Sequence, residues 1–222
     1  KYVTLSNPSY TPAENIPYNI RAYDLLDFIW RAKENSYDEY NNRIIGSLTH
    51  TYEILKGLKI RGRVGTDYTA ILEETKNRNE VPLSLGNSGS YSQGNQTYSS
   101  VYADALLMFD RKLTNDFGIV ANLGISGRDD QGYYQGSGTN GGLSVEDWFH
   151  NNASVGTIWG SSWRWEQMSR AILGTVGLNF KSYLNVEFTA RQEKFSTLPP
   201  NANTTFYPSV NAGFIFSEAF KM

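Results

Sequence analysis

The sequence predicts an all-β chain whose antiparallel, up-and-down strands form part of a transmembrane β-barrel. Three observations support this fold class. Apolar and polar residues alternate along several segments, no apolar run approaches the ~18 residues of a membrane-spanning helix, and short connections alternate with long ones. The 15 Tyr, 11 Phe and 20 Gly also favour strands joined by polar loops over helices.

The segment LKIRGRVGTDYT (58–69) is the clearest strand in the chain. Successive strand side chains point to opposite faces of a sheet, so this strand has one apolar and one charged face. A cation facing lipid would cost ~2–4 kcal/mol at the bilayer midplane, so we expect the charged face to line a water-filled lumen. A soluble sheet with one solvated face explains the same alternation. The apolar face carries Leu58, Ile60, Val64 and Tyr68, and the lumen-facing candidates are Lys59, Arg61, Arg63 and Asp67.

The same alternation predicts strands on both sides of this segment. In 184–194 the polar positions include Glu187 and Arg191, which are further lumen-facing candidates. Residues 1–40 give a weaker signal, because the spacing of Leu26 and Trp30 fits a short helix while an irregular extended segment fits equally well. The other predicted strands are 42–54, 99–113, 116–127, 171–181 and 205–216.

The connections between these strands alternate in length. Outer-membrane barrels have short periplasmic turns and longer extracellular loops, whereas soluble sandwiches seldom keep their long loops at one end. The long connections are therefore expected outside the cell. Tight turns are predicted at 55–57, 114–116 and 181–183, long outer loops at about 74–97 and 129–167, and a shorter loop at 198–204.

Six aromatic residues in the second long loop are candidates for contact with a substrate or a partner protein. Tryptophan offers a broad apolar face and an N–H donor, which suit sugar rings and peptide side chains. Packing of the loop against itself is the alternative interpretation. The six residues are Tyr133, Tyr134, Trp148, Trp159, Trp163 and Trp165.

Composition argues against several other classes of function. A net charge of −2 gives no general attraction to nucleic acid, and the absence of cysteine excludes thiolate chemistry and cysteine zinc sites. Adjacent carboxylates such as Glu73–Glu74 are interpreted as solvated loop charges, because hydrolysis needs a pair ~5–9.5 Å apart across a cleft. His50 and His150 are the only histidines, too few for a convincing metal site, and no Ser-His-Asp ordering stands out, so we predict no enzymatic activity, no metal site and no cofactor.

Three phrases are specific enough to indicate a family. They are NNRIIGSLTHTYEILKGLKIRGRVGTDYT (41–69), GGLSVEDWF (141–149), and the run from AILGTVGLNF to FYPSVNAGFIFSEAF (171–220). Together they resemble the SusC/RagA-like TonB-dependent transporters, from about residue 17 to the end of the chain. The resemblance implies a barrel of about 22 strands. Residues 1–222 would form a partial barrel domain of it, without the plug, the TonB box and the remaining strands.

The resemblance also implies a function, a location and partners. Members of the family import oligosaccharides or peptides through the outer membrane of Gram-negative bacteria. A SusD-like surface lipoprotein closes the extracellular mouth, and the TonB complex supplies energy through the plug. The expected partners of this chain are therefore the lipoprotein, the TonB complex, outer-membrane lipid and an oligosaccharide or peptide substrate, with no nucleic acid.

Two alternatives remain open at this point. A soluble secreted β-sandwich that binds carbohydrate would use the tryptophans as a sugar platform, and a second sheet would bury its apolar rows. A complete small eight-stranded barrel with an adhesive or structural role would leave no strand edge open.

Overall fold

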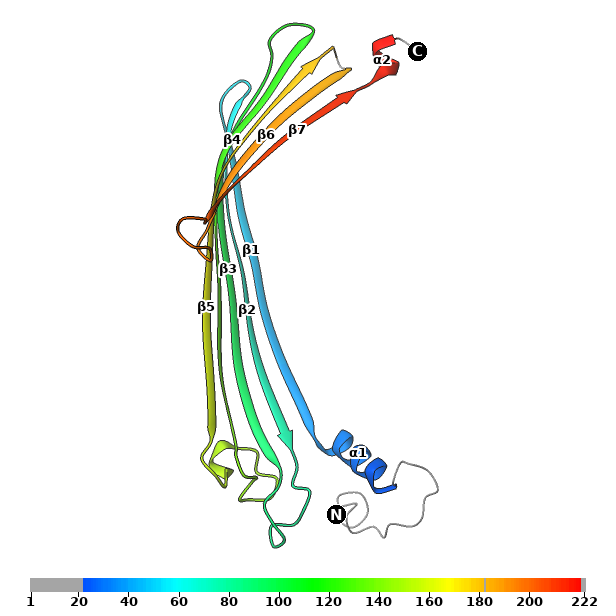
Figure 1. Cartoon of the computed structure of the whole chain (residues 1–222), viewed down its shortest axis with the longest axis vertical. Coiled ribbons are helices and arrows are strands. Elements are labelled where there is room, and N and C mark those ends of the chain that lie inside the picture. Colours follow the sequence, from blue (N-terminus) through cyan, green and yellow to red (C-terminus); the bar gives the residue numbers. More distant parts are fainter. Residues whose placement is uncertain (1–21, 182, 221–222) are drawn as a thin grey trace. The chain divides into compact units, whose positions relative to one another are not determined.

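The computed structural model describes residues 22–181 and 183–220, so the expectations for residues 1–21 lie outside the described part of the chain. Seven strands form one sheet in which each strand lies beside its neighbours in chain order (Figure 1). This antiparallel up-and-down topology confirms the predicted fold class. The strands are β1 (Ser36–Leu55), β2 (Leu58–Asn77), β3 (Ser90–Lys112), β4 (Phe117–Gly138), β5 (Trp159–Phe180), β6 (Leu184–Phe195) and β7 (Thr204–Phe214).

Short helices precede, interrupt and follow the strands in sequence. α1 (Ala22–Glu34) confirms the helical interpretation of the segment before the first strand. Its last turn carries Arg31 and Lys33, whose charges complement the negative end of the helix dipole. η2 (Asn151–Ala153) lies between β4 and β5, and α2 (Phe216–Phe220) follows β7. None of the helices in the described residues has the length and apolar character needed to cross a membrane.

The strands β1 to β5 are much longer than the hydrophobic pattern predicts. Each contains 20 to 23 residues, about twice the 9–11 that cross a membrane. The predicted extents of the two long loops are therefore wrong, because β2 and β3 are joined by 78–89 rather than 74–97, and β4 and β5 by 139–158 rather than 129–167. Most of the additional strand residues are polar or aromatic, so apolar alternation does not reveal them.

The first tight turn lies where the sequence predicts it and shows why glycine is needed there. Lys56 and Gly57 join β1 to β2, and Gly57 has a φ of 84°, in the left-handed region that favours glycine. The amide of Asp110 donates a hydrogen bond of 2.8 Å to the carbonyl of Gly57. A Cβ at this position would overlap the carbonyl oxygen of Asp110, so both the backbone angle and the close approach exclude other residues.

Internal contacts divide the chain into two compact units, which we describe separately. Unit A takes its described residues from 22–42, 69–97 and 132–164. Unit B takes its described residues from 43–68, 98–131 and 165–220. The strands β1 to β5 contribute to both units, whereas β6 and β7 belong to unit B alone.

Unit B has one apolar and one polar face. Directly opposed residues of an antiparallel pair share a face, so the pairing of β5, β6 and β7 defines both. Apolar residues oppose apolar residues, and polar residues mostly oppose polar ones. The apolar pairs include Val176–Phe188, Leu178–Val186 and Phe188–Val210, and the polar pairs include Thr175–Thr189, Asn179–Asn185 and Thr189–Ser209.

The apolar face of unit B is exposed. The exposed apolar side chains of this face include Ile60 at 42% and Val64 at 47%, together with Leu48, Leu123, Ile125, Ile172 and Val210. The described residues form a single sheet, with β1 and β7 as its edge strands and no second sheet over this face. The β-sandwich alternative is therefore wrong, and so is a closed eight-stranded barrel.

Unit A buries a small core under its two loops instead. Leu143 and Ala153 are fully buried beside Tyr91, with Phe149 packed against them. The amide of Leu143 donates to the carbonyl of Ser88 at 3.0 Å, which joins the 139–158 loop to the 78–89 loop. These two loops form one ordered layer at the ends of their strands.

Candidate functional site

The polar face of unit B carries an arginine cluster built around one carboxylate. Asp104 on β3 accepts a hydrogen bond from Arg63 at 2.6 Å and one from Arg61 at 3.3 Å, both arginines lying on β2. The side chain of Asp104 is only 12% exposed. One negative charge therefore serves two guanidinium groups, and this part of the face has an excess of positive charge.

An aromatic ring holds one of these arginines in place. The ring of Tyr102 on β3 lies across Gly65 of β2, where a Cβ would overlap it. The guanidinium carbon of Arg63 is 5.1 Å from the centroid of the same ring, a cation–π distance. Gly65 therefore makes the room for the ring on which Arg63 rests.

A groove of about 500 Å³ passes over this cluster. Four arginines and two carboxylates contribute to its wall, and Arg128 additionally pairs with Asp130 at 2.8 Å. A planar guanidinium can bind a carboxylate through two parallel hydrogen bonds, so the groove suits an anionic group better than a cationic one. The charged residues of the wall are Arg61, Arg63, Arg128, Arg191, Asp104 and Glu193.

The structure brings the lumen-facing candidates of unit B to this polar face, although not all into the groove. Asp67 forms a bidentate ion pair with Arg43 on β1, at 2.9 and 2.6 Å. Arg191 pairs with Glu193 at 3.0 Å, and Glu187 lies opposite Gly177 and Asn211 on the polar side of the pairing. Lys59 is exposed on β2, two positions before Arg61. Sequence reasoning missed Arg43 and Asp104, whose roles depend on neighbouring strands.

The aromatic candidates do not form one cluster, because adjacent residues of a strand point to opposite faces. In unit A the rings of Tyr134 and Trp163 stack with centroids 5.9 Å apart. The indole of Trp159 lies against Gly138 on this same side of β4. Tyr133 lies on the other face, where the guanidinium carbon of Arg164 is 5.6 Å from its ring centroid.

The two remaining tryptophans lie in different elements. Trp148 belongs to the 139–158 loop, is 46% exposed and stacks on His150 at 5.5 Å. Trp165 is an exposed residue of β5 in unit B. The sequence placed all six aromatics in a loop, but five of them are strand residues.

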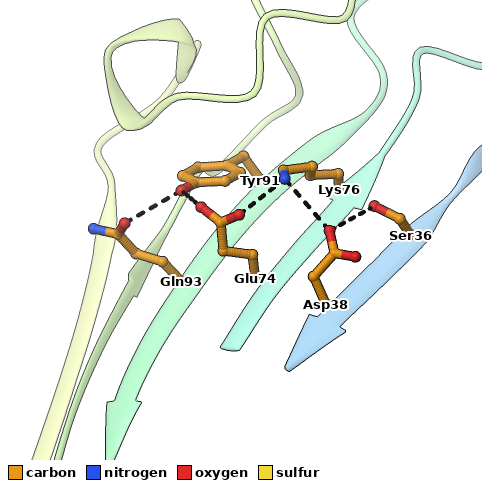
Figure 2. Close-up of polar contacts among 6 residues, drawn as sticks. All are labelled: Ser36, Asp38, Glu74, Lys76, Tyr91 and Gln93. Atoms are coloured by element: carbon orange, nitrogen blue, oxygen red, sulfur yellow. Dashed lines mark hydrogen bonds and ion pairs between the residues drawn. The ribbon is translucent and has the colours of Figure 1, made fainter. Parts of the chain in front are cut away.

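A polar network in unit A crosses β1, β2 and β3 (Figure 2). Glu73 and Tyr134, whose side chains lie beside Gly94, are on the opposite face. The ammonium group of Lys76 donates to Glu74 at 2.8 Å and to Asp38 at 3.4 Å. The hydroxyl of Tyr91 donates to Glu74 at 2.8 Å, and its oxygen lies 3.2 Å from the amide oxygen of Gln93. Glu74 and Lys76 follow Leu72 at alternate positions of β2, so the network begins where the apolar residues of that strand face end.

Electrostatics hold this network together at neutral pH. The hydrogen bonds from Lys76 and then Tyr91 lower the pKa of Glu74. The bond to Glu74 raises the pKa of Lys76, and burial followed by the bond to Glu74 raises the pKa of Tyr91. Sequence reasoning missed this network, although the change from Leu72 to Glu74 and Lys76 was its visible signal.

The carboxylates and histidines singled out in the sequence make local contacts. Glu73 accepts a hydrogen bond from the hydroxyl of Tyr37 at 3.1 Å. Asp147 bonds the side chain of Arg78 and the amide of Asn79, and His150 accepts from the amide of Asn152 through Nδ1. In the described ranges, no group of three or more His, Asp and Glu side chains is arranged to hold a metal ion.

Comparison with solved structures identifies the fold. The structure of the RagAB peptide transporter superposes with a TM-score of 0.80 over 86% of this chain, at 14% sequence identity. The RagAB peptide importer in its closed-closed and open-open states gives TM-scores of 0.80 and 0.77, also at 14% identity. The chain spans 21–22% of the length of these proteins. No protein-family profile and no curated protein matches the sequence.

Proposed function

We propose that this chain forms part of the barrel wall of an outer-membrane importer of the SusC/RagA type, which takes up oligosaccharides or peptides. The observation that carries the proposal is the pair of faces in unit B. One face exposes a row of apolar side chains, and the other bears the arginine groove. Hydrocarbon on one side and water on the other is the environment in which both faces are stable. The fold shared with a peptide transporter supports the same conclusion.

In this proposal the arginine groove lies in the wall of the transport path. Arg61 and Arg63 share Asp104, so an incoming carboxylate can bind one guanidinium without leaving Asp104 unpaired. Unmodified linear peptides carry a terminal carboxylate, and some glycans carry uronic acids. The groove therefore favours acidic cargo over neutral cargo.

The aromatic stack of unit A is proposed to meet cargo first. Tyr134 lies on β4 and Trp163 lies on β5, and unit A also contains the two loops at the strand ends. Exposed Trp148 on the 139–158 loop is proposed to contact a SusD-like lipoprotein. Import would depend on the TonB complex acting on a plug domain.

The test is growth of a strain that lacks the gene on a panel of peptides and polysaccharides. We expect loss of growth on one cargo class, with recovery when the intact gene is restored. Restoration with Arg61→Gln and Arg63→Gln should recover surface levels but not uptake of acidic cargo, whereas Lys56→Gln in the tight turn should recover both. Normal growth of the deletion strain on every nutrient, with the protein absent from the outer-membrane fraction, would contradict the proposal.

A further inference from the structure

A second groove, on the apolar face of unit B, has a volume of about 670 Å³. Its floor is made of small side chains, Ala103 and Ala105 on β3 and Gly127 on β4, and Ile125 and Ile172 rise beside them. Both isoleucines are exposed, at 60% and 58%. The groove is therefore apolar at its floor, and this floor is accessible from outside the face.

Two cations stand together at the edge of this groove. Arg170 of β5 and Lys194 of β6 are directly opposed in the antiparallel pairing, and both side chains are exposed. Like charges directly opposite each other on a sheet destabilise it. Among the described residues neither forms an ion pair, and the guanidinium of Arg170 donates only to the sulfur of Met168 at 3.3 Å.

The neighbouring groups form no ion pair with either cation in the described structure, although the carboxylate of Asp129 places one negative charge on the same face of β4. Lys194 is opposed on its other side by Thr204, which also lines the groove. Asp129, two positions beyond Gly127 on β4, accepts a hydrogen bond from Gln131. Its other oxygen is buried and has no partner within the described structure. The groove therefore presents two cations that form no ion pair in the described structure, beside an apolar floor.

The cations lie where the apolar rows of this face end. On β5 the row of aliphatic residues runs to Ile172, and Arg170 and then Met168 take the next positions on that face. On β6 the row ends at Ala190, and Gln192 and Lys194 follow. An amphiphile with an apolar chain and an anionic head would match both the order and the spacing of these groups.

We propose that this groove binds a phosphorylated membrane lipid, with an acyl chain over Ala103 and Ala105 and a phosphate between Arg170 and Lys194. The proposal rests on the membrane location given under the proposed function. Phosphate is the fitting head group because both cations are strong donors to phosphate oxygens, and a phosphate relieves the repulsion between them. An acidic protein segment would satisfy the charges but leave the apolar floor exposed, so we assign the site to a lipid.

The experiment measures lipid retention by the full-length protein, purified in detergent and stripped of lipid. Native mass spectrometry would compare binding of lipid A that carries its phosphates with binding of the same lipid A after enzymatic dephosphorylation. The wild type should prefer the phosphorylated form. The double substitution Arg170→Gln with Lys194→Gln should reduce that preference about thirtyfold, at about fivefold for each cation near an anionic head group.

Two further variants separate the parts of the site. Lys56→Gln with Lys112→Gln removes the same charge from exposed positions outside the groove and should leave the preference unchanged. Ala105→Phe fills the floor and should weaken binding of both lipids equally, because it removes the space for the chain rather than the charge. Thermal unfolding without lipid would confirm that each variant is folded.

The outcomes are distinct. Equal binding of the two lipids by the wild type overturns the proposal, and so does an equal loss of preference in the control double variant. A protein that fractionates with the outer membrane and supports growth but shows no phosphate preference overturns this site alone. Absence of the protein from that fraction overturns the proposed function and this site together.

Discussion

Units A and B share five strands but place their apolar groups differently. Unit B displays its apolar side chains in a row on one face, where Ile60, Val64 and Val210 are exposed. Unit A has few apolar strand residues and gathers its buried ones, Leu143 and Ala153, beneath two loops. Apolar alternation therefore shows what surrounds a strand, but it does not show where the strand ends. The strand pairing continues into segments that have no such alternation.

The largest effect on the stability of the assembled protein is expected when a charge is placed on the apolar face of unit B. Val64→Arg should destabilise the assembled protein by ~2–4 kcal/mol, because a cation would face hydrocarbon. The measurement is unfolding in lipid vesicles, together with the amount that reaches the outer membrane. The matched control is Asn95→Arg on an exposed position of β3 in unit A, where we expect little change. Equal tolerance of both substitutions would remove the distinction between the units.

The next effect tests the core of unit A. Leu143→Ala removes a fully buried side chain and should cost about 2–5 kcal/mol of local stability, because a cavity remains beneath the loops. Hydrogen exchange at the amide of Leu143, which bonds the carbonyl of Ser88, would report it. Leu85→Ala, at a position 61% exposed in the 78–89 loop, should leave that exchange rate unchanged. Loops that already exchange freely in the wild type would refute an ordered cap.

A smaller effect is expected on the polar face of unit B. Asp104→Asn leaves two guanidinium groups adjacent without a carboxylate, and we expect a loss of about 1–2 kcal/mol after allowing for solvent screening of the arginines. Asp130→Asn, which removes the partner of a 60% exposed Arg128, should cost less than about 1 kcal/mol. Chemical unfolding of the two variants would compare them, and a larger loss for Asp130→Asn would contradict the shared-carboxylate account.

The smallest effect concerns the network of unit A in Figure 2. The pKa of Glu74 is lowered, so its contribution to stability is complete above the ordinary carboxyl pKa and is lost as pH falls through the lowered value. The pKa of Lys76 is raised, so its contribution is complete below the ordinary lysine pKa and is lost as pH rises through the raised value.

Glu74→Gln should therefore reduce the acid sensitivity of the β1–β2 amides near the network while changing neutral stability by less than about 1 kcal/mol. Hydrogen exchange as a function of pH is the measurement. Ser36→Ala, which removes only a 3.4 Å contact to Asp38, is the control and should keep the wild-type acid profile. An unchanged acid profile in Glu74→Gln would show that Glu74 does not titrate with the network.

Most of the strand segments in unit B could be predicted from the sequence, but few of those in unit A could. The alternation in 58–69 and 184–194 predicted β2 and β6, because a strand with one apolar face carries apolar residues at every second position. The ends of β3 and β4 are rich in Ser, Gln, Gly and Tyr, so they resembled loops although they form ladders. Local hydrophobicity cannot distinguish a strand that is wet on both faces from a loop.

The candidate site was predictable as a face and not as a set of contacts. Parity along β2 placed Arg61 and Arg63 together, but their shared partner Asp104 lies on β3 and depends on inter-strand register. Register also decides that Tyr134 meets Trp163 while Tyr133 meets Arg164. A single sequence shows which residues share a strand face. It does not show which residues of the next strand they contact.

We expect lipid to contact the apolar face of unit B and water to contact its polar face. The chain has no cysteine, so single cysteines can be placed at Val186, Glu187, Phe188 and Thr189 of β6 in the full-length protein in membranes. The account predicts that a water-soluble maleimide modifies positions 187 and 189 and spares 186 and 188, and that nitroxide lipids quench a fluorophore only at 186 and 188. Protection of 186 and 188 without quenching by lipid would mean that polypeptide covers this face, and it would contradict the account.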